Sequence, residues 1–532
     1  MTMSPDDYLQ EPTAVLDSSK PASSAGRKKK IMMAVGGVVV LAVAATVIAV
    51  VATKKSDAST STSGDKATPK STPVATSGDT SIDTSLVMPK NETVDMKKFN
   101  PTTDPESMTP ALTMLAIGDW GSSPGKVSGS DENPGSCCIV YGKKTNPSEN
   151  RYKVDFWSQN HVAAMMAMSA KELKPVRVIG HGDNFYWDGL GGTDKASRFA
   201  NTFEGVYNDP ALKGVKWVNV LGNHDIGGAA YLCGAETAEF IKCKSADELV
   251  KNLKLRAQYQ MEYKSPDNDR WLLKDFYYVE SATAGGVTVD IFNIDTNYAD
   301  NHGAMQVCCQ CFGYGNDIPD FPHSKCEDAQ PGRPECAGGD VGMYNACMDT
   351  INGWGKDSLT QLDRDLKASK ANFKIINTHY SPQHHMSPDK QKVIFHIAKD
   401  NNVQLFMNGH THAFSHDTTA WGTHFIENGG GGGIYTKSGN ALSNDYVKNV
   451  WVAGGNPYGF FELSFSKDWL KTQFVTFDKS WSFAGNSLEG TKKGGIARGH
   501  CWYIPSAEYT AKGAPGIECK SSINTPLGAP LG

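Results

Sequence analysis

Five apolar segments of this chain each end beside a side chain that can bind a metal ion. Binding sites in open α/β sheets form at the carboxyl ends of strands, so side chains at these positions are candidates for one shared site. Glycine residues beside them let the chain turn sharply and bring the side chains together. The motifs that follow the five segments are Gly118-Asp119-Trp120-Gly121, Gly182-Asp183-Asn184-Phe185-Tyr186, Gly222-Asn223-His224-Asp225, Thr378-His379-Tyr380 and Gly409-His410-Thr411-His412.

Apolar runs of strand length alternate with segments of helical periodicity from residue 109 onward. Strands are expected at 112–117, 176–179, 215–221, 287–294, 373–376, 403–407 and 424–426, with a late hairpin formed by 459–465 and 472–477. Helices are expected at 154–173, 247–264, 357–370 and 389–400. This alternation predicts a layered α/β sandwich, which we assign to one catalytic domain at 109–490.

The number of candidate ligands indicates two metal ions rather than one. Seven ligands are too many for a single tetrahedral site but suit two ions that share one bridging carboxylate. Two ions about 3.5–4 Å apart can generate a hydroxide and hold both the attacking and the leaving oxygen of a displacement reaction. The seven candidates are Asp119, Asp183, Tyr186, Asn223, His379, His410 and His412.

These ordered motifs resemble those of the calcineurin-like metallophosphoesterase superfamily, and specifically the purple acid phosphatases of the tartrate-resistant, animal-like type. The similarity covers residues 110–480, and Tyr186 in the Gly-Asp-Asn-Phe-Tyr motif distinguishes this branch from relatives that lack the tyrosinate. The resemblance implies a four-layer α/β/β/α sandwich. It also implies an acid phosphatase that hydrolyses phosphate monoesters, either small molecules or phosphoproteins.

The resemblance further implies which residues hold each ion. A ferric ion, Fe(III), would be bound by Asp119, Asp183, Tyr186 and His412, and a divalent ion, Fe(II), Zn or Mn, by Asp183, Asn223, His379 and His410. The donor types agree, because phenolate and carboxylate oxygens suit Fe(III) while amide and imidazole groups suit a divalent ion. Since Fe(III) strongly lowers the pKa of bound water, a metal-bound hydroxide can attack phosphorus in line even in acid.

Further histidines are candidates for binding the substrate. His224 follows Asn223 and, like its counterpart in the family, would face the phosphate and stabilise charge or protonate the leaving oxygen. Family members carry another histidine nine residues after the position of His379, whereas here His384 and His385 come five and six residues later. Either of them could fill that role, or both could be exposed loop residues.

Other functions remain possible for such a scaffold. A phosphodiesterase or nucleotidase of the same superfamily is the nearest alternative, although Tyr186 argues against most of these. A non-catalytic cell-surface protein on a phosphatase scaffold is a second, but it would tolerate the loss of ligands, and all seven are present. A net charge of −5 over 532 residues gives no reason to expect a nucleic-acid partner.

Residues 31–53 form an uncharged apolar run long enough for a transmembrane helix. The preceding basic cluster Arg27–Lys30 predicts a cytoplasmic tail at 1–30 and a single-pass type II membrane protein with a lumenal or extracellular catalytic domain. The alternatives are a cleaved signal peptide and a buried core helix. Residues 54–108, rich in Ser and Thr, predict a disordered stalk, and Asn91 begins a glycosylation sequon that would make the chain a glycoprotein.

The twelve cysteines predict disulfides in an oxidising compartment. Six of them lie in a Gly- and Pro-rich insertion at 298–354, which begins beside the metal-bearing edge of the sheet because Asp295 ends the strand before it. Internal bridges would make this insertion a rigid flap, which we expect to overhang the phosphate site and to select or restrict substrates. The alternative is a peripheral decoration or a partner-binding knob. Residues 491–532 are expected to be a Gly- and Pro-rich tail with Cys501 and Cys519 as its staples.

Overall fold

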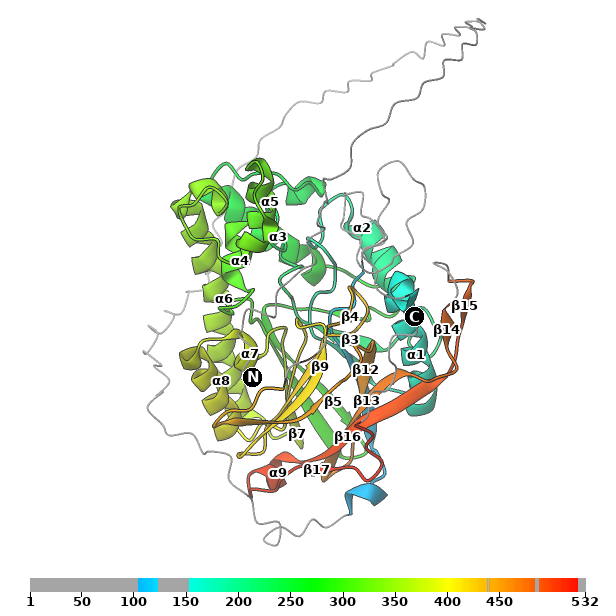
Figure 1. Cartoon of the computed structure of the whole chain (residues 1–532). Coiled ribbons are helices and arrows are strands. Elements are labelled where there is room, and N and C mark those ends of the chain that lie inside the picture. Colours follow the sequence, from blue (N-terminus) through cyan, green and yellow to red (C-terminus); the bar gives the residue numbers. More distant parts are fainter. Residues whose placement is uncertain (1–103, 123–152, 438, 440, 484–487, 525–532) are drawn as a thin grey trace, which may run out of the picture. The chain divides into compact units, whose positions relative to one another are not determined.

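The computed structural model describes residues 104–122, 153–437, 439, 441–483 and 488–524 (Figure 1). The predicted tail at 1–30, the apolar span at 31–53, most of the stalk and the Asn91 sequon lie outside these residues. Within the described part of the chain, no helix has the length and apolar character needed to cross a membrane.

One sheet has eight strands in the order β17-β16-β13-β12-β1-β2-β3-β4. Its strands span Leu112–Ile117 (β1), Arg177–Gly180 (β2), Lys216–Asn219 (β3), Trp271–Leu272 (β4), Gly459–Phe465 (β12), Trp469–Phe477 (β13), Ile496–Pro505 (β16) and Ile517–Glu518 (β17). Strands β1 to β4 are parallel, and β12 pairs with β1 antiparallel. Because Gly180 pairs with both Ile117 and Asn219, the carboxyl ends of β1, β2 and β3 lie side by side.

A second sheet has seven strands in the order β11-β9-β10-β8-β7-β6-β5. Its strands span Tyr277–Ala284 (β5), Val287–Ile294 (β6), Phe373–Asn377 (β7), Leu405–Asn408 (β8), Phe414–Thr419 (β9), His424–Asn428 (β10) and Val447–Val452 (β11). Strands β6, β7, β8 and β10 are parallel, so the loops after β7 and β8 leave from the same edge.

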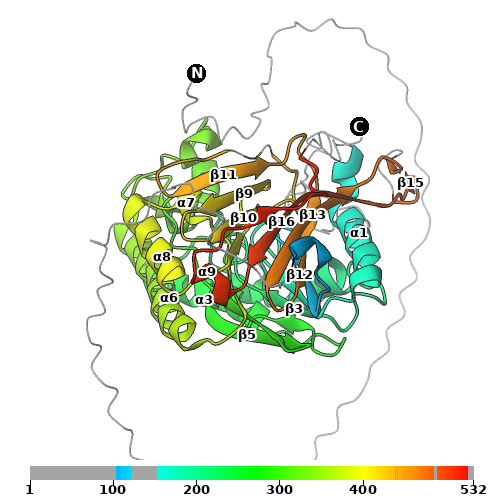
Figure 2. The same cartoon turned by 90° about the horizontal axis from the view of Figure 1, so that it is seen from below.

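The two sheets pack against each other through an apolar core to which both contribute, including Met114 of β1, Val289 of β6 and Ile375 of β7. Helix α1 (Ser158–Leu173) lies against the first sheet and α6 (Val341–Ala368) against the second. Figures 1 and 2 show α1 on one side of the paired sheets, and α6 with α8 (Pro388–Asp400) on the other. The described residues thus form the layered α/β sandwich that the alternating pattern predicts.

Further elements complete the fold. The helical ones are α2 (Lys195–Arg198), α3 (Ala246–Met261), α4 (Ala304–Cys309), α5 (Cys311–Tyr314), α7 (Pro382–His385), α9 (Ala507–Thr510) and a π-helical turn at Phe199–Glu204. Single 3-10 turns lie at Pro105–Ser107, Lys153–Trp157, Ala235–Thr237, Gly315–Asp317, His323–Cys326 and Ala337–Gly339, and β14 (Ser482–Phe483) pairs with β15 (Thr491–Lys492).

Two predicted boundaries need correction. The helix expected at 357–370 begins at Val341, where the Asp340 side chain accepts a hydrogen bond from the backbone N–H of Met343 and caps it. Gly342, Gly353 and Gly355 weaken the helical signal of its first half, which tertiary packing overrides.

The segment 491–532 was expected to be a tail, but part of it belongs to the first sheet. Strand β16 pairs with β13 over most of its length and carries β17 on its other side. The Cys501–Cys519 disulfide, as expected, staples these two strands. Glycines at 494, 495 and 499 hide the strand in the sequence, although Ile504 is fully buried in the core between the sheets.

The insertion at 298–354 is folded, with α4, α5 and the start of α6 inside it. All six of its cysteines pair with one another, as Cys308–Cys347, Cys309–Cys336 and Cys311–Cys326. Four of them, with Ala329, form a small apolar core of their own. The prediction of internal disulfides is therefore confirmed, and the insertion is a compact body rather than a loop without structure.

Candidate metal centre

The seven predicted ligands meet where the two sheets present their carboxyl edges to each other. Asp119, Asp183 and Asn223 lie in the loops that follow β1, β2 and β3 of the first sheet. The histidines lie in the loops after β7 and β8 of the second sheet, and they are His379, His410 and His412. Each sheet thus supplies about half of the centre.

One group of donors consists of Asp119, Asp183, His412 and Tyr186. The first three offer ligand atoms within 4.8 Å of one another. The Tyr186 hydroxyl donates to Asp119 Oδ1 at 3.0 Å and lies 3.1 Å from His412 Nε2. Asp119, Asp183 and Tyr186 are buried, and Asp183 Oδ2 has no hydrogen-bond partner among the described residues. This group offers the hard oxygen donors of one metal site.

A second group shares Asp183 and adds nitrogen and amide donors. Asp183, His379 and His410 again offer atoms within 4.8 Å of one another. Asn223 Oδ1 lies 3.1 Å from His379 Nε2 and 3.2 Å from His410 Nδ1, and these two nitrogens are 3.2 Å apart. Asp183 is the one residue common to both groups, which is the position of a bridging ligand.

The contacts of His379 show that a cation fits this second group. Its Nδ1 lies 2.8 Å from the carbonyl oxygen of His181, which can only accept, so Nδ1 carries the proton and Nε2 presents a lone pair. That lone pair faces Asn223 Oδ1, which is also an acceptor. Two acceptors at this distance repel each other unless a cation lies between them.

Burial perturbs the titration of the same side chains. It raises the pKa of Asp119 and of Tyr186 well above their ordinary values, and the Asp183 carboxylate adds to the effect on Asp119. Burial also lowers the pKa of His379 and His410, which keeps these imidazoles neutral and able to bind a metal. The Asp119 carboxyl and the Tyr186 phenol need a nearby positive charge to ionise here, and a metal ion would supply it.

Four of the seven candidates have a left-handed backbone, which side chains other than glycine seldom adopt. Their φ angles are 54° at Asp119, 50° at Asp183, 76° at His410 and 51° at His412. Residues held in this conformation cluster at functional sites, because surrounding structure must compensate its cost of about 1–3 kcal/mol each. These four residues lie in the loops that turn the ligands inward.

Neighbouring glycines are required by close packing at two of these turns. A Cβ on Gly222 would lie 2.1 Å from Asp183 Oδ1, and a Cβ on Gly409 would lie 2.1 Å from Asp119 Oδ2. Any larger residue would therefore displace a carboxylate of the centre.

Two residues that are not among the predicted ligands hold the loops in place. Asp225 accepts hydrogen bonds from the backbone N–H groups of Asn184, Phe185 and Gly222 at 2.8–3.1 Å. It thereby joins the loop that bears Asp183 to the loop that bears Asn223. Asn377, at the end of β7, donates to the Gly180 carbonyl of β2 at 3.0 Å and so links the two sheets directly below the centre.

The predicted substrate-side histidines fall in different surroundings. His224 packs against Tyr186, with ring centroids 4.5 Å apart, and its Nδ1 donates to the carbonyl of Trp187. His385 packs against the candidate ligand His410, with centroids 4.8 Å apart. His384 lies instead near Asp417, and its Nε2 is 4.0 Å from Oδ2 of the Asp417 carboxylate.

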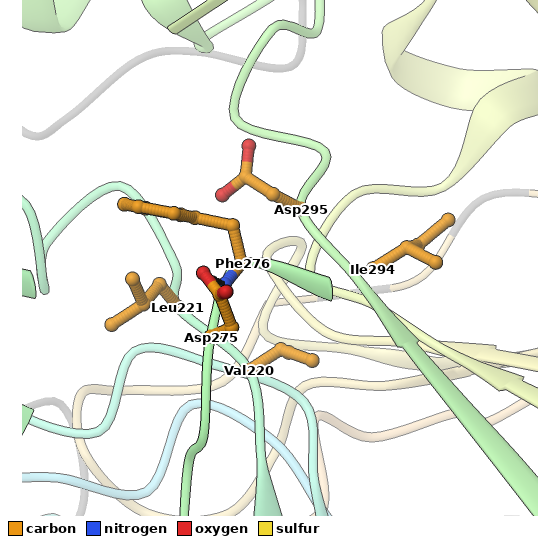
Figure 3. A pocket seen from close by; sticks show the side chains of 6 residues that line it. All are labelled: Val220, Leu221, Asp275, Phe276, Ile294 and Asp295. Carbon is orange, nitrogen blue, oxygen red and sulfur yellow. Dashed lines mark hydrogen bonds between the residues drawn. The ribbon is translucent and has the colours of Figure 1, made fainter. Parts of the chain in front are cut away.

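A depression beside the centre is shown in Figure 3. It lies near the ends of β3 and β6, and it is lined by Val220, Leu221, Asp275, Phe276, Ile294 and Asp295. It is too narrow for a water molecule and contains none of the seven candidates. Burial raises the pKa of Asp295 to about 7, and its carboxylate accepts from the Asn297 side chain at 2.8 Å.

No protein-family model matches this chain. It is 23% identical over 325 residues to purple acid phosphatase 7 of Arabidopsis thaliana, across 60% of this chain and 70% of the relative. It is 30% identical over 119 residues to tartrate-resistant acid phosphatase type 5 of Sus scrofa, across 22% of this chain and 26% of the relative. A solved structure, "GAP50 the anchor in the inner membrane complex of Plasmodium", aligns with a TM-score of 0.40 and 16% identity over 73% of this chain and 90% of that one.

Proposed function

Because this chain is a binuclear-metal phosphatase of the purple acid phosphatase group, we propose that it hydrolyses phosphate monoesters in acid with a ferric and a divalent ion. The observation that carries the proposal is the pair of ligand groups that share Asp183. Asp119, Asp183, Tyr186 and His412 would hold Fe(III), and Asp183, Asn223, His379 and His410 would hold Fe(II), Zn or Mn. The oxygen-rich set and the nitrogen-rich set match the preferences of these ions.

When bound, two such ions polarise the phosphate group and provide a nucleophile from water at low pH. The side chains then have separate tasks. His224 Nδ1 is occupied by the Trp187 carbonyl, so Nε2 is the ring atom free to donate to a phosphate oxygen when the ring is protonated. His385, packed on His410, is the nearer of the two adjacent histidines to the divalent site and would contact the leaving group.

Metal analysis and visible spectroscopy of the purified protein test the metal assignment. A tyrosinate on Fe(III) gives a charge-transfer band, so the oxidised protein is expected to be pink or purple. Tyr186→Phe is expected to abolish the band, and His379→Ala to retain it as long as iron is bound. A colourless, fully active protein containing only zinc or manganese would contradict the mixed-metal assignment.

Enzyme assays test the substrate class. The protein is expected to hydrolyse a chromogenic phosphomonoester at pH 5 and to remain active in tartrate. A clear preference for phosphodiesters or nucleotides would favour the neighbouring activities of the superfamily instead. A protein that binds both metals but hydrolyses none of these esters would contradict the enzymatic role.

The position of the compact insertion supports the proposal that this insertion selects substrates. Its Phe312 backbone N–H donates to the Ala229 carbonyl, and its Gln310 side chain accepts from the Leu232 backbone N–H. It therefore lies on the loop that follows His224.

Replacing residues 310–338 by a Gly/Ser linker, together with Cys309→Ser, preserves the Cys308–Cys347 bridge. A flap that selects substrates is expected to yield a larger gain in kcat/KM for a phosphoprotein than for an aryl phosphate. Unchanged values in a folded, iron-loaded variant would contradict this role.

We also propose that the run at 31–53 anchors the protein with its catalytic domain outside the cytoplasm. The five disulfides among the described residues support an oxidising compartment. Protease added to the cytoplasmic face of sealed vesicles is expected to remove only residues 1–30. Recovery of a soluble protein that starts near residue 54 would indicate cleavage instead.

A further inference from the structure

A histidine that no motif indicated, His302, lies beside the metal centre. It belongs to the segment 297–303 that leads from β6 into the disulfide-bonded insertion. Its ring centroid is 6.0 Å from that of His410. Burial is the main cause that lowers the pKa of His385, and the neighbouring His384 and His302 add to this effect. The insertion therefore places an imidazole of its own at the nitrogen-rich side of the centre.

The backbone of this segment is held by the elements that carry the centre. The N–H groups of Asp300 and Asn301 both donate to the His385 carbonyl at 3.0 Å. The Tyr380 hydroxyl donates to the His302 carbonyl at 2.6 Å. Lys390 of α8 forms an ion pair with the Asp300 carboxylate at 2.6 Å. His302 is thus positioned relative to His385 and to the loop after β7 by four direct contacts.

Disulfides hold the segment from its other side. Helix α4 begins two residues after His302, and it contains Cys308 and Cys309. These are bonded to Cys347 of α6 and to Cys336. Both ends of the short segment are fixed. Little conformational entropy of this segment therefore remains to be lost when the His302 side chain binds a ligand.

One ring nitrogen of the His302 side chain lacks a partner. Its Nε2 is buried without a hydrogen bond to any of the described residues. An unsatisfied buried polar atom costs about 1–3 kcal/mol. The φ angle of 57° adds backbone strain. Both features are typical of a residue that is retained for a ligand.

We propose that His302 is a substrate-binding residue, whose Nε2–H donates a hydrogen bond to an oxygen of the phosphate ester on the side of His410. The neutral tautomer with its proton on Nε2, and equally the protonated ring, makes this atom a hydrogen-bond donor. Phosphate and leaving-group oxygens are acceptors and satisfy this atom. The inference rests on the proposed phosphatase function, and it adds a specificity residue that the disulfide-bonded insertion contributes.

The test uses the full-length, metal-loaded protein and inorganic phosphate as the probe. His302→Asn removes the ring, while asparagine tolerates the left-handed backbone at this position. Calorimetric titration is expected to show phosphate binding about tenfold weaker than in the wild type, with unchanged metal content. For an aryl phosphate, KM is expected to rise more than kcat falls. Lys325→Gln, an exposed change in the same insertion, serves as the control and is expected to bind phosphate as the wild type does.

Three outcomes separate the explanations. Wild-type phosphate affinity and KM in folded His302→Asn would overturn the proposal. Loss of a metal ion from this variant would also overturn it, since His302 would then belong to the metal site. A wild-type protein that binds two metals but neither binds phosphate nor hydrolyses esters would instead refute the proposed function on which the inference rests.

Discussion

His384 and His385 are adjacent in sequence, yet their rings lie in different environments. His385 is buried against His410 and Tyr380, with centroids 4.8 and 5.5 Å away. His384 faces Asp417, whose carboxylate also accepts from Gln383 at 2.9 Å. Because the short helix α7 directs consecutive side chains about 100° apart, only one of the two can reach the metal centre.

This difference predicts unequal effects of equivalent substitutions. His385→Gln is expected to lower kcat for an aryl phosphate by about 100-fold, the lower end of the range for a lost acid–base group. His384→Gln is the matched control, and it is expected to keep kcat within about twofold while the thermal midpoint falls. Steady-state kinetics at pH 5 on metal-loaded protein measure both, and the reverse order would assign the role to His384.

The loops after β2 and β3 are held together by one carboxylate, Asp225. Asp225→Asn replaces an acceptor of several backbone N–H groups by a side chain with only one oxygen, so at least one buried N–H loses its partner. The expected cost is about 1–3 kcal/mol of unfolding free energy, together with metal binding about 10–100-fold weaker. Urea denaturation and metal titration measure these quantities. Asp389→Asn, whose side chain is 94% exposed, should change neither.

A chain of three buried imidazoles joins strands of the two sheets. His416 of β9 lies with Nδ1 2.8 Å from His500 Nε2 of β16 and with Nε2 2.8 Å from His424 Nδ1 of β10. His500 Nδ1 in turn donates to Asn524 Oδ1 at 2.8 Å. Burial lowers the pKa of His424 to about 3 and that of His500 to about 4. The folded protein therefore holds these rings neutral.

The three buried imidazoles predict that the protein loses stability in acid. Unfolded histidine binds a proton below about pH 6.5, whereas folded His424 and His500 do so only near pH 3 and 4. Their contribution is thus complete above pH 6.5 and is lost as the pH falls toward 4, by about 1.4 kcal/mol per pH unit for each ring.

His424→Gln removes one of these rings and tests this linkage. The variant is expected to show a shallower decline of unfolding free energy between pH 6 and pH 4 than the wild type, by about that 1.4 kcal/mol per pH unit. Urea denaturation across this range is the measurement. Lys448→Gln, exposed on neighbouring β11, should keep the wild-type slope. Equal slopes in all three proteins would show that the imidazole chain does not control acid stability.

For the molecule as a whole, the metal centre joins two sheets that otherwise meet through apolar side chains and links such as Asn377 to Gly180. Ions bound to ligands from both sheets stabilise only the folded state. Removing them with a chelator is expected to lower the unfolding free energy by about 4 kcal/mol for each ion that is present at a thousandfold excess over its Kd. Thermal unfolding before and after chelation measures this, and metal added back should restore the midpoint.

Much of this protein is determined by its sequence alone. The alternation of strands and helices predicts the α/β layers, because periodicity follows directly from which faces are buried. The five strand-end motifs indicate all seven residues that the structure brings together, since carboxyl ends of parallel strands share an edge. Disulfides within the insertion could be expected from the number of its cysteines, although their pairing could not.

Only the tertiary structure decided the remaining features, because they depend on contacts between residues far apart in the chain. Strand β16 is recognisable only beside β13, and α6 begins at Val341 only because packing outweighs its glycines. The choice between His384 and His385, the hydrogen bonds to Asp225 and the position of His302 have no periodic signal. Each arises where loops from different elements approach, and local sequence carries no information about that approach.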